Sequence, residues 1–329
     1  MPVSTTVIIC TRNRADHLHD TLAAVNQLAV PEYLAPKLLV VDNASTDSTS
    51  IVLDNPPVEN IPARQIVEPS IGAARARNTA LREASGQILL WLDDDVRVPP
   101  DWLVRMTKPI LEDHADAVAG KVTLAPHLRR SWMKPFHRAT LASTESIDPE
   151  APKDIISANM AISRRVLEKV SRFDPELGPG RLGTMEDTLF SWQLREAGYR
   201  IEMVTEAAVE HHFDEKRLTR DGFVRAAISR GRSLSYIRYH WLHRPQKDWT
   251  HRDFSYQVWR QPQLILIKRL VDREVRRWAH WLRQKNGAID KEEFWAVINL
   301  YNLKQYLAER TRPRNYRERG LAKLRGEML

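Results

Sequence analysis

Residues 88–95, with the sequence Ile-Leu-Leu-Trp-Leu-Asp-Asp-Asp, decide the fold class. Five apolar residues in succession are typical of a strand that is buried on both of its faces. Such strands form the parallel sheets of α/β proteins, in which helices cover both sides of the sheet. The three aspartates that follow mark the carboxyl end of the strand, which is where ligands bind in open α/β sheets.

The chain before this stretch alternates strands and helices. Apolar runs at 7–10, 38–41 and 65–67 predict further strands. The spacing of apolar residues predicts one helix that Asn13 caps and a second over about 71–84. We therefore expect an α/β fold with a mostly parallel sheet flanked by helices, followed by a helical C-terminal extension. The polar residues that end the strands, at 11–14, 42–43 and 93–95, are expected at one edge of the sheet.

The acidic run at the end of the strand predicts a cation site. Two unit charges 4 Å apart interact by about 4 kcal/mol at an effective dielectric constant near 20, so adjacent carboxylates repel strongly. Asp93 and Asp95 share a face of an extended chain, and oxygen ligands suit Mg²⁺ or Mn²⁺. The alternative is a solvated acidic turn that caps the helix near Trp102.

Two other polar groups are candidates for chemistry. Glu186 and Asp187 open a predicted helix, where one of them is placed to act as a general base; alternatively, they only complement the helix dipole. His211 and His212 follow a short apolar run, and either imidazole is a candidate ligand for an Mn²⁺-like ion; alternatively, both are surface residues.

Two segments are predicted to be loops. Residues 178–183 match the G-x-G-x-x-G pattern, but they do not follow a strand and they contain Pro179, so a dinucleotide-binding role is not supported. Residues 127–152 have weak periodicity and predict an irregular segment.

Composition limits the class of protein further. The chain has 329 residues, of which 43% are hydrophobic, and it is long enough for one large domain or two smaller ones. Cys10 is its single cysteine, which excludes an internal disulfide and any cysteine-based metal cluster. The sequence holds no apolar stretch of membrane-spanning length and no basic signal-peptide start, so we expect a cytoplasmic protein.

The net charge of +8 is distributed unevenly. Residues 1–213 carry 23 Lys and Arg against 29 Asp and Glu, whereas residues 214–329 carry 27 against 13 and six of the ten Trp. The expected domains are therefore 1–213, which divides into halves of about 1–98 and 99–213, and a basic, Trp-rich helical region over 214–329. A predicted amphipathic helix over 263–284 suits an anionic membrane surface or a lipid-linked ligand; alternatively, it packs on the first domain or in a homo-oligomer. No nucleic-acid reader motif is present, so nucleic acid is not an expected partner.

Several motifs, taken in order, resemble one enzyme family. The chain is similar to the GT-A glycosyltransferases of family 2 in a series of short motifs. These motifs are residues 7–14, residues 40–47, Ile71-Gly72 with Ala76-Arg77-Asn78, residues 92–95, Asn159, Phe173-Asp174 and Glu186-Asp187. The resemblance extends over about residues 3–213. It implies a GT-A catalytic domain, with a donor half for the nucleotide sugar over about 1–98 and an acceptor half over about 99–213, and a D-x-D motif at 93–95.

The resemblance also implies roles for single residues. Asp42 would bind the nucleotide base, and Thr11, Arg14, Arg77, Asp93 and Asp94 would bind the rest of the nucleotide sugar. Asn159 would lie on the acceptor side. Asp95 and His211 would bind Mn²⁺ or Mg²⁺, with His212 as the alternative to His211. Asp187 would be the general base, with Glu186 beside it.

The reaction implied is the inverting transfer of a sugar from a nucleotide sugar, with a UDP-sugar favoured, to a glycan, lipid-linked or small-molecule acceptor. A sugar-phosphate nucleotidyltransferase is one alternative, but it calls for a glycine-rich first loop and residues 10–14 contain no glycine. A catalytically silent scaffold of the same fold is the other, and the acidic residues argue against it. The implied location is the cytoplasm, with peripheral attachment to the inner face of the membrane as an option.

Overall fold

The computed structural model describes residues 1–145, 154–243, 289–316 and 321. By their internal contacts, these residues form two compact units that meet in sequence at Asp214 and Glu215. The first unit carries every candidate residue named above, and it is described first. Its elements, in chain order, are β1 (Val3–Thr11), α1 (Ala15–Val25), β2 (Leu34–Asp42), α2 (Thr49–Asp54), β3 (Ala63–Val67), α3 (Ala73–Glu83), β4 (Ile88–Asp93), β5 (Val96–Arg97), α4 (Trp102–Leu111), β6 (Ala117–Leu124), η1 (Pro126–Leu128), α5 (Pro135–Thr140), β7 (Asn159–Ser163), η2 (Arg164–Glu168), α6 (Glu186–Glu196) and β8 (Ile201–His211).

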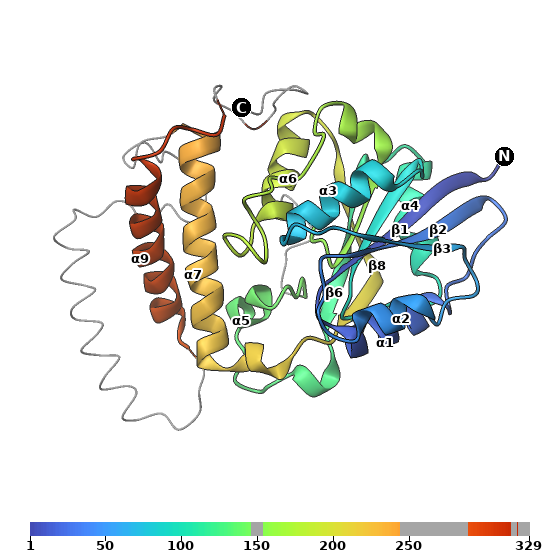
Figure 1. The fold of residues 1–329 in the computed structure, drawn as a ribbon, viewed down its shortest axis with the longest axis horizontal. Coiled ribbons are helices and arrows are strands. Elements are labelled where there is room, and N and C mark those ends of the chain that lie inside the picture. Colours follow the sequence, from blue (N-terminus) through green and yellow to red (C-terminus); the bar gives the residue numbers. More distant parts are fainter. Residues whose placement is uncertain (146–153, 244–288, 317–320, 322–329) are drawn as a thin grey trace. The chain divides into compact units, whose positions relative to one another are not determined.

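The strands form one eight-stranded sheet in the order β3-β2-β1-β4-β7-β6-β8-β5. Figure 1 shows this sheet with helices on either side of it. The first four are parallel, as predicted. Beyond β4 the sheet is mixed, because β7 runs antiparallel to both β4 and β6, and β5 runs antiparallel to β8. β6 and β8 are parallel, so four of the seven strand pairings are parallel and the expected α/β fold is confirmed, with a sheet that is mixed in its second half. An apolar run reports burial on two faces and carries no signal for the direction of the neighbouring strand.

Helices cover both faces of the sheet, and alternate residues of each strand supply the two cores. Val7, Ile9 and Leu90 pack with residues of α1 and α4 on one face. Ile8 and Trp91 pack with residues of α3 and α6 on the other. This two-sided burial is the physical reason for the uninterrupted apolar run of β4.

Two local expectations are corrected. Helix α1 begins at Ala15 with Arg14 as its N-cap residue, and Asn13 has a left-handed backbone with φ of 55°. Asn13 instead accepts a hydrogen bond from Thr46 N, so its side chain joins two loops rather than capping a helix. The weakly periodic stretch after β6 contains η1 and α5, and it is therefore partly helical.

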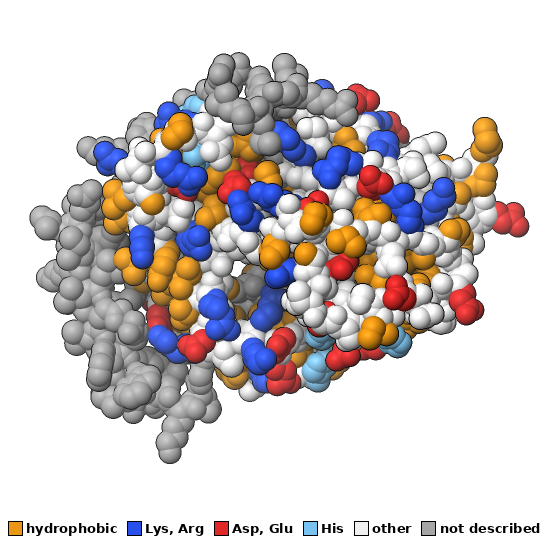
Figure 2. Space-filling model, in the orientation of Figure 1, with side chains coloured by type: hydrophobic (Ala, Val, Ile, Leu, Met, Phe, Trp, Pro, Cys, Tyr) orange, Lys and Arg blue, Asp and Glu red, His pale blue; other side chains and the backbone are white. Residues whose placement is uncertain are grey.

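The second unit is helical where it is described. It contains η3 (Glu215–Leu218), α7 (Arg220–Tyr236), the π-helical turn η4 (Ile237–Trp241) and α9 (Lys291–Glu309), with α7 packed against α9. Lys and Arg side chains and hydrophobic side chains both lie over α7 and α9 on the face drawn in Figure 2. The predicted helix over 263–284 lies outside the described residues. Among the helices that are described, none combines the length and the apolarity needed to span a bilayer.

Candidate active site

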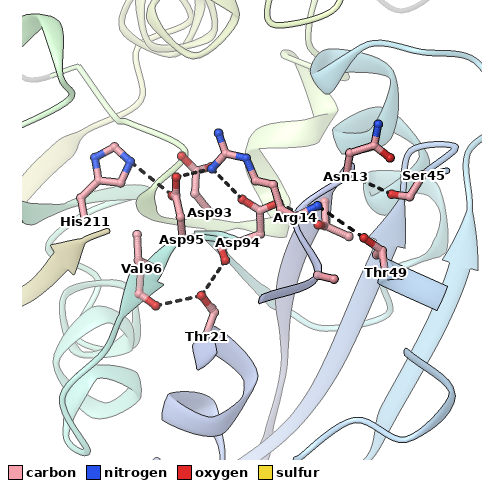
Figure 3. A network of polar contacts seen from close by, with 12 residues as sticks. Asn13, Arg14, Thr21, Ser45, Thr49, Asp93, Asp94, Asp95, Val96 and His211 are labelled. Atoms are coloured by element: carbon pink, nitrogen blue, oxygen red, sulfur yellow. Dashed lines mark hydrogen bonds and ion pairs between the residues drawn. The ribbon is translucent and has the colours of Figure 1, made fainter. Parts of the chain in front are cut away.

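The strand register brings the predicted polar residues together. Cys10 pairs with Asp93 and Thr11 pairs with Asp42, so the carboxyl ends of β1, β2 and β4 lie side by side. The short strand β5 pairs with the end of β8, which places Val96 opposite His211. The acidic run is therefore held between the parallel half of the sheet and the last strand, as Figure 3 shows.

The backbone of the acidic run is fixed from α1. The hydroxyl of Thr21 lies 2.8 Å from the carbonyl oxygen of Asp94 and 3.0 Å from that of Val96, and its single proton is shared between them (Figure 3). The amide of His212 donates to the carbonyl of Asp95 at 2.7 Å. The three carboxylates thus project from a rigid turn rather than from a mobile loop.

Asp93, Asp95 and His211 form the candidate metal site. One potential ligand atom from each residue lies within 4.8 Å of the others. Within the described part of the chain, this is the one such group of three His, Cys, Asp or Glu residues. Asp95 and His211 are each 2% exposed, so an ion bound there would be shielded from bulk water.

The orientation of His211 fits a metal ligand. Its Nδ1 lies 3.0 Å from the carbonyl oxygen of Leu141, and a carbonyl only accepts, so Nδ1 carries a proton. In the neutral ring this leaves the lone pair of Nε2 directed at Asp95 Oδ1, 3.2 Å away. Nε2 and Oδ1 would then both be hydrogen-bond acceptors, and two acceptors this close repel unless a proton or a cation lies between them. A backbone carbonyl that fixes the tautomer of a ligand histidine is a common arrangement in metal sites. The donor set therefore fits Mn²⁺ or Mg²⁺.

Asp94 is held by the protein itself. The Thr11 hydroxyl donates to its Oδ2 at 2.7 Å, and Arg14 contacts its Oδ1 at 3.3 Å. Burial raises the pKa of Asp94 to about 7; Arg14 lowers it less strongly, and Asp95 raises it further. Thr11 and Asp94, both expected to bind the nucleotide sugar, are hydrogen-bonded to each other here, and their contact with the donor stays a prediction.

Arg77 of α3 connects the two halves of the site. It donates to Glu186 Oε1 at 2.6 Å and to Ser157 Oγ at 2.7 Å, and it lies 3.7 Å from Asp93 Oδ1. The guanidinium is buried and bridges these carboxylates, and its expected contact with the nucleotide stays a prediction from the family resemblance. Burial raises the pKa of Glu186 to about 7, with Arg77 opposing the rise and Asp187 adding to it.

Asp187 is the more accessible carboxylate at the start of α6. Its Oδ2 accepts from the amide and the hydroxyl of Ser157 at 3.3 and 3.4 Å, whereas Glu186 is 4% exposed. Met185, directly before the pair, has a left-handed backbone with φ of 74°, which turns the chain into the helix. Non-glycine residues in this conformation are strained, and they cluster at functional sites.

Two predicted residues differ from the others in their surroundings. Asp42 is nearly buried at the end of β2, where its Oδ1 accepts from the Ser45 amide at 3.0 Å. His212 turns toward Glu210, 3.3 Å away, and its ring lies against that of His127. Of the two adjacent histidines, His211 is therefore the one directed at the acidic cluster.

Asn159 lies in the core at the start of β7. Its Oδ1 accepts from Trp102 Nε1 at 2.8 Å, and its Nδ2 donates to the carbonyls of Lys121 and Ala207 at 2.9 and 2.7 Å. Asn159 is fully buried. These three bonds join strands and helices of the acceptor half to one another, so we propose a structural role for this residue, and its acceptor-side role stays a prediction from the family resemblance.

Some residues of the site were not anticipated. Leu141 contributes a backbone carbonyl, for which the sequence offers no signal. Ser157 and Thr21 hold the base candidate and the acidic turn, but serine and threonine are too common to be singled out by pattern alone. Arg14 was expected to bind the nucleotide sugar, and its actual contact with Asp95 depends on a tertiary arrangement that no short motif reports.

Known proteins share this architecture. The structure of the mannosyltransferase PcManGT from Pyrobaculum calidifontis, in complex with GDP-Man and Mn²⁺, matches with a TM-score of 0.57 over 93% of this chain and 87% of that one, at 18% identity. Glycosyltransferase AglE of Haloferax volcanii is 28% identical over 203 residues, which are 59% of this chain and 62% of the relative. The succinoglycan biosynthesis protein ExoM of Rhizobium meliloti is 30% identical over 115 residues, 35% of this chain and 37% of the relative. The matched segments thus span less than two thirds of these curated relatives.

The sheet and these likenesses define a glycosyltransferase of the GT-A fold. The model of "Glycosyl transferase family 2" matches residues 6–171, half of the chain, and the protein belongs to that family. The family resemblance drawn from the strand-end motifs is thereby confirmed, and so is the assignment as an enzyme.

Proposed function

We propose that this family 2 glycosyltransferase moves a sugar from a nucleotide sugar to an acceptor hydroxyl, with inversion of the anomeric carbon and with Mn²⁺ or Mg²⁺ as cofactor. The observation that carries the proposal is a continuous path of contacts. It runs from Asp93 in the metal cluster through Arg77 and Ser157 to Asp187 at the start of α6. A donor-side acid and an acceptor-side acid are thus fixed in one site.

The donor side of the site comprises Asp42 and the acidic run. Asp42 lies where the end of β2 meets that of β1, and we assign it to the nucleotide base. Asp93, Asp95 and His211 would hold the divalent ion, which when bound supplies Lewis-acid stabilisation of the negative charge on the departing diphosphate. We take a UDP-sugar as the donor; the GDP-Man bound by the mannosyltransferase of the same fold makes a GDP-sugar the first alternative to test.

Asp187 is the general base in this proposal. It is the less buried carboxylate of the pair, and Ser157 orients its Oδ2 with two hydrogen bonds. A carboxylate held in this way can accept the proton of the attacking hydroxyl. Attack from the face opposite the leaving diphosphate inverts the anomeric carbon, and holding acceptor and donor in line supplies much of the rate.

Glu186 positions the site rather than reacting. Its carboxylate is buried against Arg77, and Arg77 in turn lies close to Asp93. A buried arginine that is shared by several carboxylates keeps the donor half and the acceptor half at a fixed separation. The alternatives of a nucleotidyltransferase and of a silent scaffold are not favoured by the family of the chain.

Substitution of the proposed base tests this function. Asp187→Asn should keep donor binding and lower transfer by about 10² to 10⁴-fold, because general-base catalysis contributes on that order. Glu196→Gln, at the far end of α6, is the matched control and should transfer sugar like the wild type. Donor binding by calorimetry, with UDP- and GDP-sugars in Mn²⁺, is measured beside transfer. Unchanged transfer in Asp187→Asn would refute the assignment of the base.

The acceptor is a glycan, a lipid-linked sugar or a small molecule in this proposal. We further propose that the enzyme works in the cytoplasm and that the basic C-terminal region reaches an anionic membrane surface, where a lipid-linked acceptor would be found. The excess of Lys and Arg over residues 214–329 supports this part of the proposal. Association into a homo-oligomer stays a prediction from sequence.

A further inference from the structure

Arg14 occupies an unusual position between the donor loop and the acidic cluster. As the N-cap residue of α1, it has a fixed backbone, and its amide donates to Thr49 Oγ1 at 3.4 Å. Its side chain is 35% exposed, so the guanidinium is attached to a rigid point but borders solvent. Such a side chain can change partners without any change in the fold.

The guanidinium lies on two carboxylates at once. Its Nη1 contacts Asp94 Oδ1 at 3.3 Å and also contacts Asp95 Oδ2 (Figure 3). The other oxygen of Asp95 faces His211 Nε2 at 3.2 Å. Asp95 is therefore shared between a cationic side chain of the protein and the group of residues that fits a divalent ion.

Electrostatics makes these two uses of Asp95 compete. With no ion bound, Arg14 supplies the positive charge that three adjacent carboxylates need if they are to remain together at the end of β4. A divalent ion at Asp93, Asp95 and His211 would lie within a few ångströms of the guanidinium, and the two cations would repel. Because Arg14 and the ion would share the carboxylate of Asp95, ion binding would weaken the contact of Arg14 with it.

A displaced guanidinium would remain at the edge of the donor site, because its backbone does not move. Arginine binds phosphate groups through paired N–H donors, and a diphosphate is the anion that a nucleotide sugar brings. We infer that Arg14 is a positioning residue with two alternating partners. It is the resident counter-ion of Asp94 and Asp95 before the ion binds, and it moves to the donor diphosphate when the ion and the nucleotide arrive. This inference rests on the proposed metal-dependent function.

The test measures Mn²⁺ binding directly, by the loss of the free-ion electron paramagnetic resonance signal. The full-length variants are Arg14→Met, Arg14→Lys and the matched control Arg12→Met, which removes an exposed arginine from the same loop. Without nucleotide, Arg14→Met should bind Mn²⁺ about tenfold more tightly than the wild type, because one competing charge is gone. Arg14→Lys should lie near the wild type, and Arg12→Met should equal it.

A second readout uses UDP with saturating Mn²⁺. Here the order should reverse, with Arg14→Met binding UDP about tenfold more weakly than the wild type, because a charge-assisted contact to the diphosphate is lost. A purely structural role for Arg14 would weaken both Mn²⁺ and UDP binding together. Weaker or unchanged Mn²⁺ binding in Arg14→Met, with a wild type that binds the ion, overturns the inference alone. Failure of every variant and of the wild type to bind Mn²⁺ overturns the proposed metal site, and the inference with it.

Discussion

Glu186 and Asp187 are neighbours in sequence, but they have different surroundings. Glu186 is buried and bonded to Arg77, whereas Asp187 is half-buried and bonded to Ser157. Burial of a carboxylate disfavours its charged form, so the pKa of Glu186 rises to about 7 from its ordinary value of 4.5. Different surroundings give two adjacent acids different properties, and this suits a site in which Glu186 holds Arg77 in place while Asp187 reacts.

The raised pKa of Glu186 predicts how stability depends on pH. At pH 4 and below, the folded and the unfolded chain both carry the proton, and the stabilising effect is complete. As pH rises from about 4.5 to about 7, the unfolded chain loses the proton first, so the stabilising effect is lost across that window. In Glu186→Gln this dependence should be absent. The melting temperature of the wild type in EDTA should therefore fall relative to that of Glu186→Gln between these pH values.

Glu196→Gln, at the exposed far end of α6, is the control for this measurement, because it leaves Glu186 and its neighbours unchanged and should keep the pH dependence of the wild type. The prediction would be contradicted if the melting temperatures of the wild type and of Glu186→Gln changed equally with pH between about 4.5 and 7. Such a result would mean that Arg77 holds Glu186 ionised in spite of its burial.

At the scale of elements, the family motifs correspond to pairings between helices and loops. Asn78 of α3 pairs with the backbone of Phe173 in both directions, donating to its carbonyl at 2.9 Å and accepting from its amide at 2.8 Å. Its neighbour Arg77 reaches Glu186 of α6. The glycines at 178 and 180 have positive φ, and a Cβ at Gly178 would lie 2.9 Å from the carboxyl carbon of Glu186. The glycine-rich loop thus makes room for the acid rather than for a phosphate.

The sequence predicted the elements of the donor half because a buried strand needs an uninterrupted apolar run. It also predicted the acidic strand end and the opening of α6, since both lie in their expected order among the family motifs. It did not report the direction of β7, because burial is the same for parallel and antiparallel neighbours. Nor did it report the Leu141 carbonyl or the Asp95–Arg14 contact, since both depend on which segments meet in space.

Asn159 provides a prediction at this scale. Its three hydrogen bonds join Trp102 of α4, Lys121 of β6 and Ala207 of β8, and a Cβ at Gly120 would lie 2.2 Å from its amide nitrogen. Asn159→Ala should lower the free energy of unfolding by about 2–5 kcal/mol, because it leaves buried polar groups unsatisfied. Chemical denaturation measures this, with the exposed Asn55→Ala as the control. Normal stability with weaker acceptor binding would contradict the structural role and support the acceptor-side role of Asn159.

At the scale of the whole molecule, charge separates the two parts of the chain. Residues 1–213 have an excess of acid and residues 214–329 an excess of base. The described helices of the second unit add exposed Leu300 and Leu307, at 45% and 49%, to this basic composition. Such a region binds an anionic lipid surface in two ways: its Lys and Arg attract the headgroups, and its apolar side chains enter the lipid.

This composition predicts binding to vesicles that contain phosphatidylglycerol and little binding to vesicles of phosphatidylcholine alone. Binding should be lost in about 1 M salt, where the Debye length falls to about 3 Å. One variant replaces four exposed basic residues of the second unit by Gln, namely Arg225, Arg230, Lys304 and Arg310. It should bind the vesicles more weakly, because each basic residue near the membrane surface contributes about 1 kcal/mol. The matched control replaces four exposed basic residues of the first unit by Gln, namely Lys37, Arg64, Lys108 and Lys169. Co-sedimentation measures each variant. Equal losses in the two fourfold variants would show that net charge alone, and not the C-terminal region, directs the enzyme to anionic lipid.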